Sequence, residues 1–293
     1  HGPKLLMILY FKSLPILYSM KNGARVLVKT GRLAHDPESS SIFTRRIAET
    51  GQFLLQVMCP DGLEHRKIAI EACLKVRLIH ASIRHFIPTD QWNEAMWGKP
   101  VNQEDLAATL MTFSISLTDG LKQFNIRISR EEEQAYLHCW RVTGHLMGID
   151  DDLLPETPEE ARFLLERILE RQSAGSEEGK ILTSALVRFV DEQIDSSILS
   201  ASPRILIRHL AGVTIAERVG VRKGRFWWFH ILLPAILKAF FSVGEKLEDR
   251  VGVLEKFTDK ASHKILHKMV GYFDEYKQTH FTVPDSLKKE WQV

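Results

Sequence analysis

Three cationic side chains, Arg77, His80 and Arg84, follow one another at spacings of three and four residues. If this part of the chain is helical, the spacing places all three on one stripe of the helix. Because the surrounding segment Lys67–Ile87 is largely apolar, charges there need an anionic or metal partner. A histidine between two arginines suits haem, since imidazole binds iron and guanidinium groups pair with propionates.

A structural interpretation of the same stripe is also open. Arg-x-x-His-x-x-x-Arg is a loose pattern, and a helix with one polar edge produces it without any cofactor. In that case the arginines bond to helix C-termini or to acidic residues. The spacing alone does not separate the two interpretations, so the neighbouring segments have to be considered.

Further segments accompany the stripe along the chain. They are Thr30-Gly-Arg-Leu33, Arg45-Arg-Ile-Ala-Glu-Thr50, Thr109-Leu-Met-Thr-Phe113, and Trp140-Arg-Val-Thr-Gly-His-Leu-Met-Gly-Ile149 followed by Asp150-Asp-Asp-Leu-Leu-Pro155. In this order, the segments and the stripe resemble the oxygenase family of the MpaB and latex-clearing-protein kind. The resemblance runs from about Leu14 through Pro155 and weakens in the C-terminal half. The segment that begins at Trp140 and the cationic stripe are its more specific parts.

The resemblance implies roles for the stripe. His80 would be the proximal axial ligand to the iron of haem b. Arg77 and Arg84 would hold the propionates or fix their helix against the haem edge. The implied reaction is an O2-dependent oxidation or cleavage of an alkene in a lipophilic substrate, with isoprenoids among the candidates.

The resemblance also implies a distal side of the pocket. Arg46 and Thr50 match the arginine and threonine of a distal motif, and Thr112 matches a second pocket-lining threonine. The rubber-cleaving members have a lysine, which can cap the iron, just before the distal threonine, and this chain has Glu49 there. Their catalytic base has no match in Lys29-Thr-Gly-Arg32. A smaller lipophilic substrate than rubber is therefore expected.

Glu49 itself has two open interpretations. It is either a catalytic base in the pocket, its pKa raised by burial, or a structural partner of Arg45 or Arg46. The function as a whole also keeps alternatives. One is a non-enzymatic haem-binding or lipid-binding helical protein, and another is a helical protein without a cofactor.

Helical spacing dominates the chain and predicts an all-α fold. We expect a single domain over residues 1–293, with about nine or ten helices around a globin-like haem-binding core. Ser173–Gly179, rich in Gly, Ser and Glu, marks a subdomain joint. The N-terminal helix should bend or break at Pro15, and Ser129 with Glu132 forms a capping box. The helices predicted to lead up to and carry the candidate residues are Lys4–Met20, Ile42–Met58, Leu63–Ile87, Gln103–Phe124 and Ser129–Ile149.

Composition restricts the partners and the location. A net charge of +2 gives no electrostatic footprint for nucleic acid. Cys59, Cys73 and Cys139 are expected to be buried thiols in a reducing, cytoplasmic compartment, and His145 is expected in the core. The sequence starts at His1 rather than methionine, so we expect that a segment, with any targeting signal, preceded it.

One long apolar segment bears on membrane contact. Phe226–Val243 starts with four aromatic residues and follows Arg222, Lys223 and Arg225. His230 within it is costly at a bilayer centre, so a buried helix is expected in preference to a membrane span. Peripheral docking, with the aromatic residues at the headgroups, is a third interpretation. The expected partners are thus a lipophilic small molecule, O2 and, under this last interpretation, a membrane surface.

Overall fold

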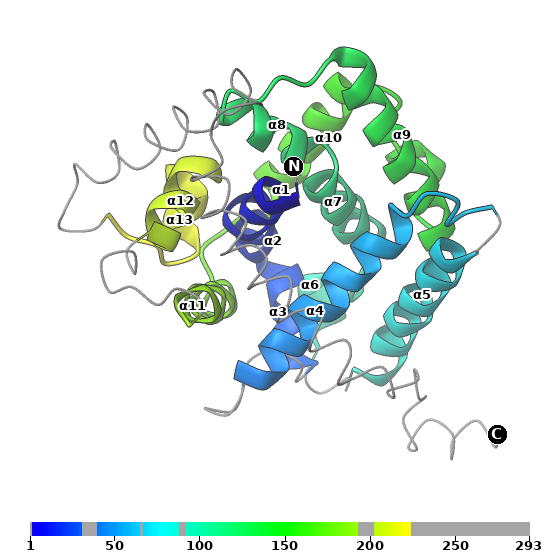
Figure 1. The fold of residues 1–293 in the computed structure, drawn as a ribbon. Helices are drawn as coiled ribbons and strands as arrows, with labels where there is room; N and C mark the ends of the chain where they lie inside the picture. The colour runs from blue at the N-terminus through cyan, green and yellow to red at the C-terminus, as the bar shows by residue number, and fades with distance from the viewer. Residues whose placement is uncertain (1, 31–39, 65–66, 88–91, 193–201, 224–293) are drawn as a thin grey trace.

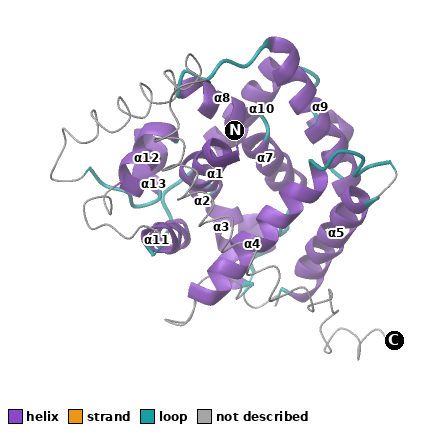
Figure 2. Cartoon of the chain, in the orientation of Figure 1, coloured by secondary structure: helices purple, strands orange, loops and turns teal. Residues whose placement is uncertain are grey.

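A computed structural model describes residues 2–30, 40–64, 67–87, 92–192 and 202–223, and this part of the chain is helical without a single β-strand (Figures 1 and 2). The predicted all-α fold is confirmed. The first half contains α1 (Gly2–Ile8), η1 (Leu9–Ser13), α2 (Leu14–Ser19), α3 (Lys21–Lys29), α4 (Ser40–Val57), α5 (Ile68–Phe86) and α6 (Glu94–Trp97). The second half contains α7 (Gln103–Phe113), α8 (Ile115–Gln123), α9 (Arg130–Met147), η2 (Asp151–Leu153), α10 (Pro158–Gln172), α11 (Glu177–Asp191), α12 (Ser202–Leu210) and α13 (Val213–Arg218).

The N-terminal helix is interrupted where Pro15 predicts it. A π-helical turn, η1, precedes α2, and Pro15 lies in the first turn of α2. Proline has no N–H to donate and its ring displaces the carbonyl four residues earlier, so a wider turn accommodates it. The residues of η1 are all buried, and this turn therefore lies inside the core.

The segment predicted as one helix over Gln103–Phe124 is two helices. The chain turns at Ser114, whose N–H and hydroxyl both donate to the carbonyl of Leu110, at 3.0 and 2.8 Å. Such a hydroxyl bond back into the preceding turn competes with the helical ladder and bends it. The bend lets α8 approach α1 so closely that a Cβ on Gly120 would overlap Cγ2 of Ile8.

The capping box predicted at the start of α9 is present. The N–H of Glu132 donates to Oγ of Ser129 at 3.1 Å, and the N–H of Ser129 donates to the Glu132 carboxylate at 2.8 Å. The helix ends at Gly148 in the left-handed conformation, with φ of +80°. Two side chains expected to be buried here are exposed, Cys139 and His145, and those predictions were wrong. Both lie off the face of α9 that carries its buried residues, and His145 Nδ1 lies 2.9 Å from the Asp151 carboxylate.

A single hydrophobic cluster connects the described helices, from Ile8 in α1 to Val221 after α13. Cys73 lies within it and is buried as predicted, whereas Cys59 is only half-buried. Helix α4 contacts α5 on one side and α11 on the other (Figure 1). This arrangement makes α4 the partition between the cationic stripe on α5 and the helices at the C-terminal end of the described chain.

The segment predicted as a subdomain joint is bonded to the core. Oγ of Ser173 donates to Oγ of Ser19 at 2.7 Å, and the N–H of Ala174 donates to the Ser19 carbonyl at 3.0 Å. Within the described ranges, no helix has both the length and the apolar character that crossing a bilayer requires. The segment Phe226–Val243 lies outside those ranges.

Candidate functional site

His80 lies on α5 and is surrounded by positive charge. Burial, followed by the charges of Arg46 on α4 and Arg84 on α5, lowers the pKa of His80 to about 4. Its Nδ1 atom is buried and has no hydrogen-bond partner among the described residues. At neutral pH His80 is therefore a neutral imidazole with an unpartnered ring nitrogen, the state in which histidine binds a metal.

Two arginines, Arg46 and Arg84, lie close enough to His80 to act on its charge. Arg46 is half-buried on α4, and its charge also acts on Tyr18 of α2, whose pKa is raised by burial and lowered in part by Arg46. Arg84 is exposed, and its Nη1 donates to the carbonyl of Val101 at 3.1 Å. A guanidinium carries five N–H groups, so the bond to Val101 leaves Arg84 capacity for an anionic ligand.

Arg77, the third member of the stripe, lies elsewhere. Its guanidinium packs on Gly148 at the C-terminal end of α9, where a Cβ on that glycine would lie 2.8 Å from Cζ of Arg77. A cation at this position interacts favourably with the negative end of the helix dipole. The structural interpretation of the stripe expected such a contact. The sequence predicted a haem contact for Arg77, and that prediction is not tested by this position.

The predicted distal residues lie on two helices. Thr50 is half-buried on α4, and its hydroxyl donates to the carbonyl of Arg46 at 2.9 Å. Thr112 on α7 is fully buried, and its hydroxyl donates to the carbonyl of Thr109 at 2.8 Å. Glu49 is exposed on α4, so burial does not make it a pocket base, and the interpretation as a structural residue fits its position better.

Sequence reasoning missed two polar residues at the start of α7. Gln103 bonds the last turn of α9, and Asp105 is buried with an Oδ1 atom that has no hydrogen-bond partner among the described residues. Burial raises the pKa of Asp105 to about 6. The pattern Asn102-x-x-Asp105 only indicates a helix start, and Asn102 is indeed the N-cap of α7. No sequence signal separated Asp105 from an ordinary first-turn acid.

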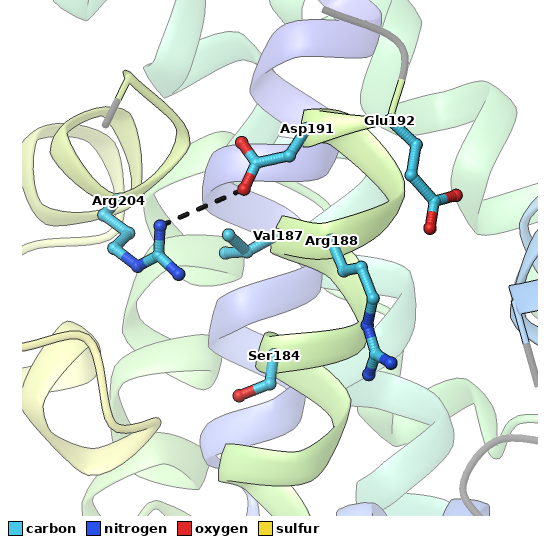
Figure 3. A pocket seen from close by; sticks show the side chains of 6 residues that line it. All are labelled: Ser184, Val187, Arg188, Asp191, Glu192 and Arg204. Carbon is cyan, nitrogen blue, oxygen red and sulfur yellow. Dashed lines mark ion pairs between the residues drawn. The ribbon is translucent and has the colours of Figure 1, made fainter. Parts of the chain in front are cut away.

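A surface hollow of about 590 Å³ lies between α11 and α12, and it contains none of the predicted residues (Figure 3). It is lined by Ser184, Val187, Arg188, Asp191, Glu192 and Arg204. An ion pair at 4.0 Å joins Asp191 to Arg204 across it. The hollow is lined by residues of α11 and α12, whereas His80 is on α5, and α4 lies between α11 and α5 (Figure 1).

The residues around His80 fit haem in their chemistry. One neutral imidazole nitrogen suits an iron, and the guanidinium groups of Arg46 and Arg84 suit two carboxylates. The observation that carries this fit is the buried, unpartnered Nδ1 of His80 beside two cations. The same three residues would equally suit another metal complex that carries anionic groups.

Known proteins are similar to this chain in sequence and in fold. Residues 7–236 match the family described as "ER-bound oxygenase mpaB/B'/Rubber oxygenase, catalytic domain". The rubber oxygenase of Streptomyces sp. (strain K30) is 25% identical over 213 residues, which are 71% of this chain and 52% of that protein. The chain thus spans about half the length of that relative. The solved structure of latex clearing protein LCP in the closed state shares the fold, with a TM-score of 0.68 and 21% identity over 90% of this chain and 70% of that one.

Proposed function

We propose that this chain, which belongs to the mpaB and rubber oxygenase catalytic-domain family, is a haem b-dependent oxygenase. It would oxidise or cleave an alkene in a lipophilic substrate with O2, and polyisoprene-like molecules are candidates because a rubber oxygenase is among its relatives. The observation that carries the proposal is the neutral imidazole of His80, whose buried Nδ1 atom has no hydrogen-bond partner among the described residues and on which the charges of Arg46 and Arg84 act.

In this proposal the imidazole of His80 would bind the iron. Its low pKa keeps the imidazole unprotonated through the physiological range, so protons do not compete with the metal. Arg46 on α4 and Arg84 on α5 would pair with the two propionates. When bound, haem supplies the iron centre that binds and activates O2. The chain would supply the orientation of the ligand and the cations that pair with the propionates.

The distal side would be formed by α4 and α7. The hydroxyls of Thr50 and Thr112 are both bonded to carbonyls of their own helices, so neither presents a free donor to an apolar substrate. Small residues whose polar groups are already satisfied suit a pocket for an alkene. Glu49 would remain outside this pocket, as its exposed side chain indicates.

A visible absorption spectrum of the purified protein, reconstituted with haemin, tests the cofactor. We expect a Soret band and the pyridine haemochrome of haem b. His80→Ala should abolish or strongly shift the band and leave the helical circular dichroism intact. An unchanged spectrum and haem stoichiometry in that variant would reject His80 as the ligand.

Oxygen uptake tests the activity separately. The reconstituted protein should consume O2 in the presence of an isoprenoid alkene such as squalene and release carbonyl products. The matched saturated hydrocarbon, squalane, is the control, since it offers no double bond. A protein that binds haem but consumes no O2 with any alkene would be a haem-binding protein without this activity.

A further inference from the structure

We propose that Gln103, Gly148 and Arg77 form a clamp that fixes the rotation of α5 against α9 and thereby orients His80. Arg77 is then a positioning residue, which acts on the ligand through the helix that both share. This inference rests on the proposed role of His80 as the iron ligand.

The first half of the clamp is the side-chain amide of Gln103. Its Nε2 donates to the carbonyl of Gly148 at 2.9 Å, and its Oε1 accepts from the N–H of Asp150 at 3.0 Å. Both partners are backbone groups in the turn that ends α9. The amide thus ties the first residue of α7 to this turn through two bonds and leaves the turn little freedom.

The second half is the contact between Gly148 and Arg77. Gly148 has φ of +80°, a conformation that favours glycine, and it ends α9 with N–H bonds to the carbonyls of Gly144 and His145. A Cβ here would lie 2.8 Å from Cζ and 3.0 Å from Nε and Nη2 of Arg77. Glycine is therefore required twice, for the turn and for the space that the guanidinium occupies.

The clamp acts on the later turns of α5, where no described side chain is fully buried. The only buried side chains described in α5 are Ala69, Ala72 and Cys73, all in its first two turns. His80 follows three residues after Arg77, less than one helical turn further along. Holding the guanidinium of Arg77 on α9 therefore determines the direction in which the His80 ring leaves the helix. Beyond His80, the bond from Arg84 to Val101 restrains the same helix.

Three variants of the clamp test the inference in the haem-loaded protein. Gln103→Glu keeps the acceptor for Asp150 and loses the donor for Gly148, while Gly148→Ala places a methyl group against Arg77 and Arg77→Ala removes the guanidinium. Each should alter the iron–histidine band in the resonance Raman spectrum of the ferrous protein. Each should also speed haem loss by about tenfold. The combination of Gly148→Ala with Arg77→Ala should do no more than either change alone, because both break the same contact.

Gly212→Ala is the matched control. Gly212 also has a left-handed φ, +89°, but nothing lies within 4 Å of the position of its Cβ. This variant should lose stability through backbone strain and keep the wild-type Raman band. If Gly212→Ala changes the band as Gly148→Ala does, loss of stability alone explains the effect and the clamp is rejected. If only Arg77→Ala alters haem retention, Arg77 contacts the haem directly and the clamp is again rejected.

Hydrogen exchange of the apoprotein separates the clamp from the proposed cofactor. Gln103→Glu should raise the exchange of the amides of α5 from residue 77 to residue 84, and Gly212→Ala should not. Unchanged exchange in α5 would reject the clamp whether or not haem binds. A wild-type protein that takes up no haem would reject the proposed function. Hydrogen exchange of the apoprotein would still test whether the clamp restrains α5.

Discussion

Two charged regions of this molecule differ in how their charges are satisfied. Around His80, the buried Nδ1 atom has no hydrogen-bond partner among the described residues, and the positive charges of Arg46 and Arg84 act on the imidazole. Between α8, α9 and α10, by contrast, Arg162 donates to the carboxylates of both Asp119 and Glu133. We propose that the first region is a binding site, whereas the second is a structural crosslink between three helices.

The crosslink, which we name the Arg162 junction (Thr118, Asp119, Lys122, Glu133 and Arg162), shows what a satisfied buried charge needs. Glu133 accepts from Thr118 at 2.9 Å and from Lys122 at 2.7 Å in addition to Arg162. Burial raises the pKa of Glu133, yet these bonds and charges outweigh it, and its pKa is lowered overall. At His80, by contrast, the buried Nδ1 atom has no hydrogen-bond partner among the described residues, and the haem that we propose would satisfy it.

Breaking the Arg162 junction should have the largest effect on stability. Arg162→Met would leave Asp119 and the nearly buried Glu133 without their shared guanidinium, and we expect unfolding free energy to fall by about 2–3 kcal/mol. Denaturant unfolding measures this. Arg167→Met on the same helix is the control, because its pairs with Glu166 and Glu170 are exposed and should matter by less than about 0.5 kcal/mol. Equal losses in both variants would contradict the comparison.

The unfolding free energy of the apoprotein should depend on pH through His80 and Asp105, and the two residues should change it in opposite directions. The folded pKa of His80, about 4, is below its ordinary value. The unfolded state therefore binds a proton first, and the protein loses stability as pH falls from about 6.5 towards 4. The folded pKa of Asp105, about 6, is above its ordinary value, so its burial penalty is relieved as pH falls from about 6 towards 4.

Two variants separate these contributions. Relative to wild type, His80→Gln should gain stability between pH 7 and pH 4.5, while Asp105→Asn should lose it, each by about 2 kcal/mol. Urea unfolding at both pH values measures the difference. Parallel pH profiles for the two variants would contradict the opposite effects of His80 and Asp105 on the pH dependence of stability.

The parts of the fold that could be predicted from sequence are those set by local chemistry. The break at Pro15 and the capping box at Ser129 depend on a residue's own backbone geometry and on partners three residues away. The turn at Ser114 could not be predicted in this way, because serine is tolerated inside helices. The turn accompanies the approach of Gly120 to Ile8, residues far apart in the chain.

The same limit applies to the candidate site. Spacing placed Arg77, His80 and Arg84 on one stripe, but it could not show that Arg77 lies against Gly148, which is 71 positions away. The segment beginning at Trp140 was recognised as a motif, and the structure supplies its physical reason. Gly144 lets Leu154 and Leu110 approach α9, while Gly148 ends that helix and admits Arg77.

Arg84 offers a smaller test, directed at the ligand. Arg84→Ala should weaken haem retention by roughly 1–3 kcal/mol if the guanidinium forms a charge-assisted bond to a propionate. Its stability cost should be small, because the side chain is exposed and, among the described residues, its one hydrogen bond goes to the Val101 carbonyl. Transfer of haem to apomyoglobin measures retention. Wild-type haem retention in this variant would show that Arg84 only holds the loop before α7. Its role would then be structural, like that of Arg162.

Glu49 should give the smallest effect, and it tests whether the distal side lacks an internal ligand. Because the side chain is exposed, Glu49→Gln should change stability by less than about 0.5 kcal/mol and leave the haem spectrum as it is. With no lysine before Thr50, the resting ferric iron should be five-coordinate or water-bound, hence high-spin, and should bind azide readily.

Introducing an amine at this position provides the converse test. Because the side chain at position 49 is exposed and lies outside the proposed pocket, the amine of Glu49→Lys should leave the ferric iron high-spin and able to bind azide, whereas a low-spin form that binds azide slowly would place this position inside the pocket. Electron paramagnetic resonance distinguishes the two spin states. A wild-type protein that is already low-spin and indifferent to azide would mean that another side chain occupies the distal position. Protein side chains would then occupy both sides of the haem, much as the carboxylates of the Arg162 junction surround its guanidinium. The two regions would differ only in that one of them holds a cofactor.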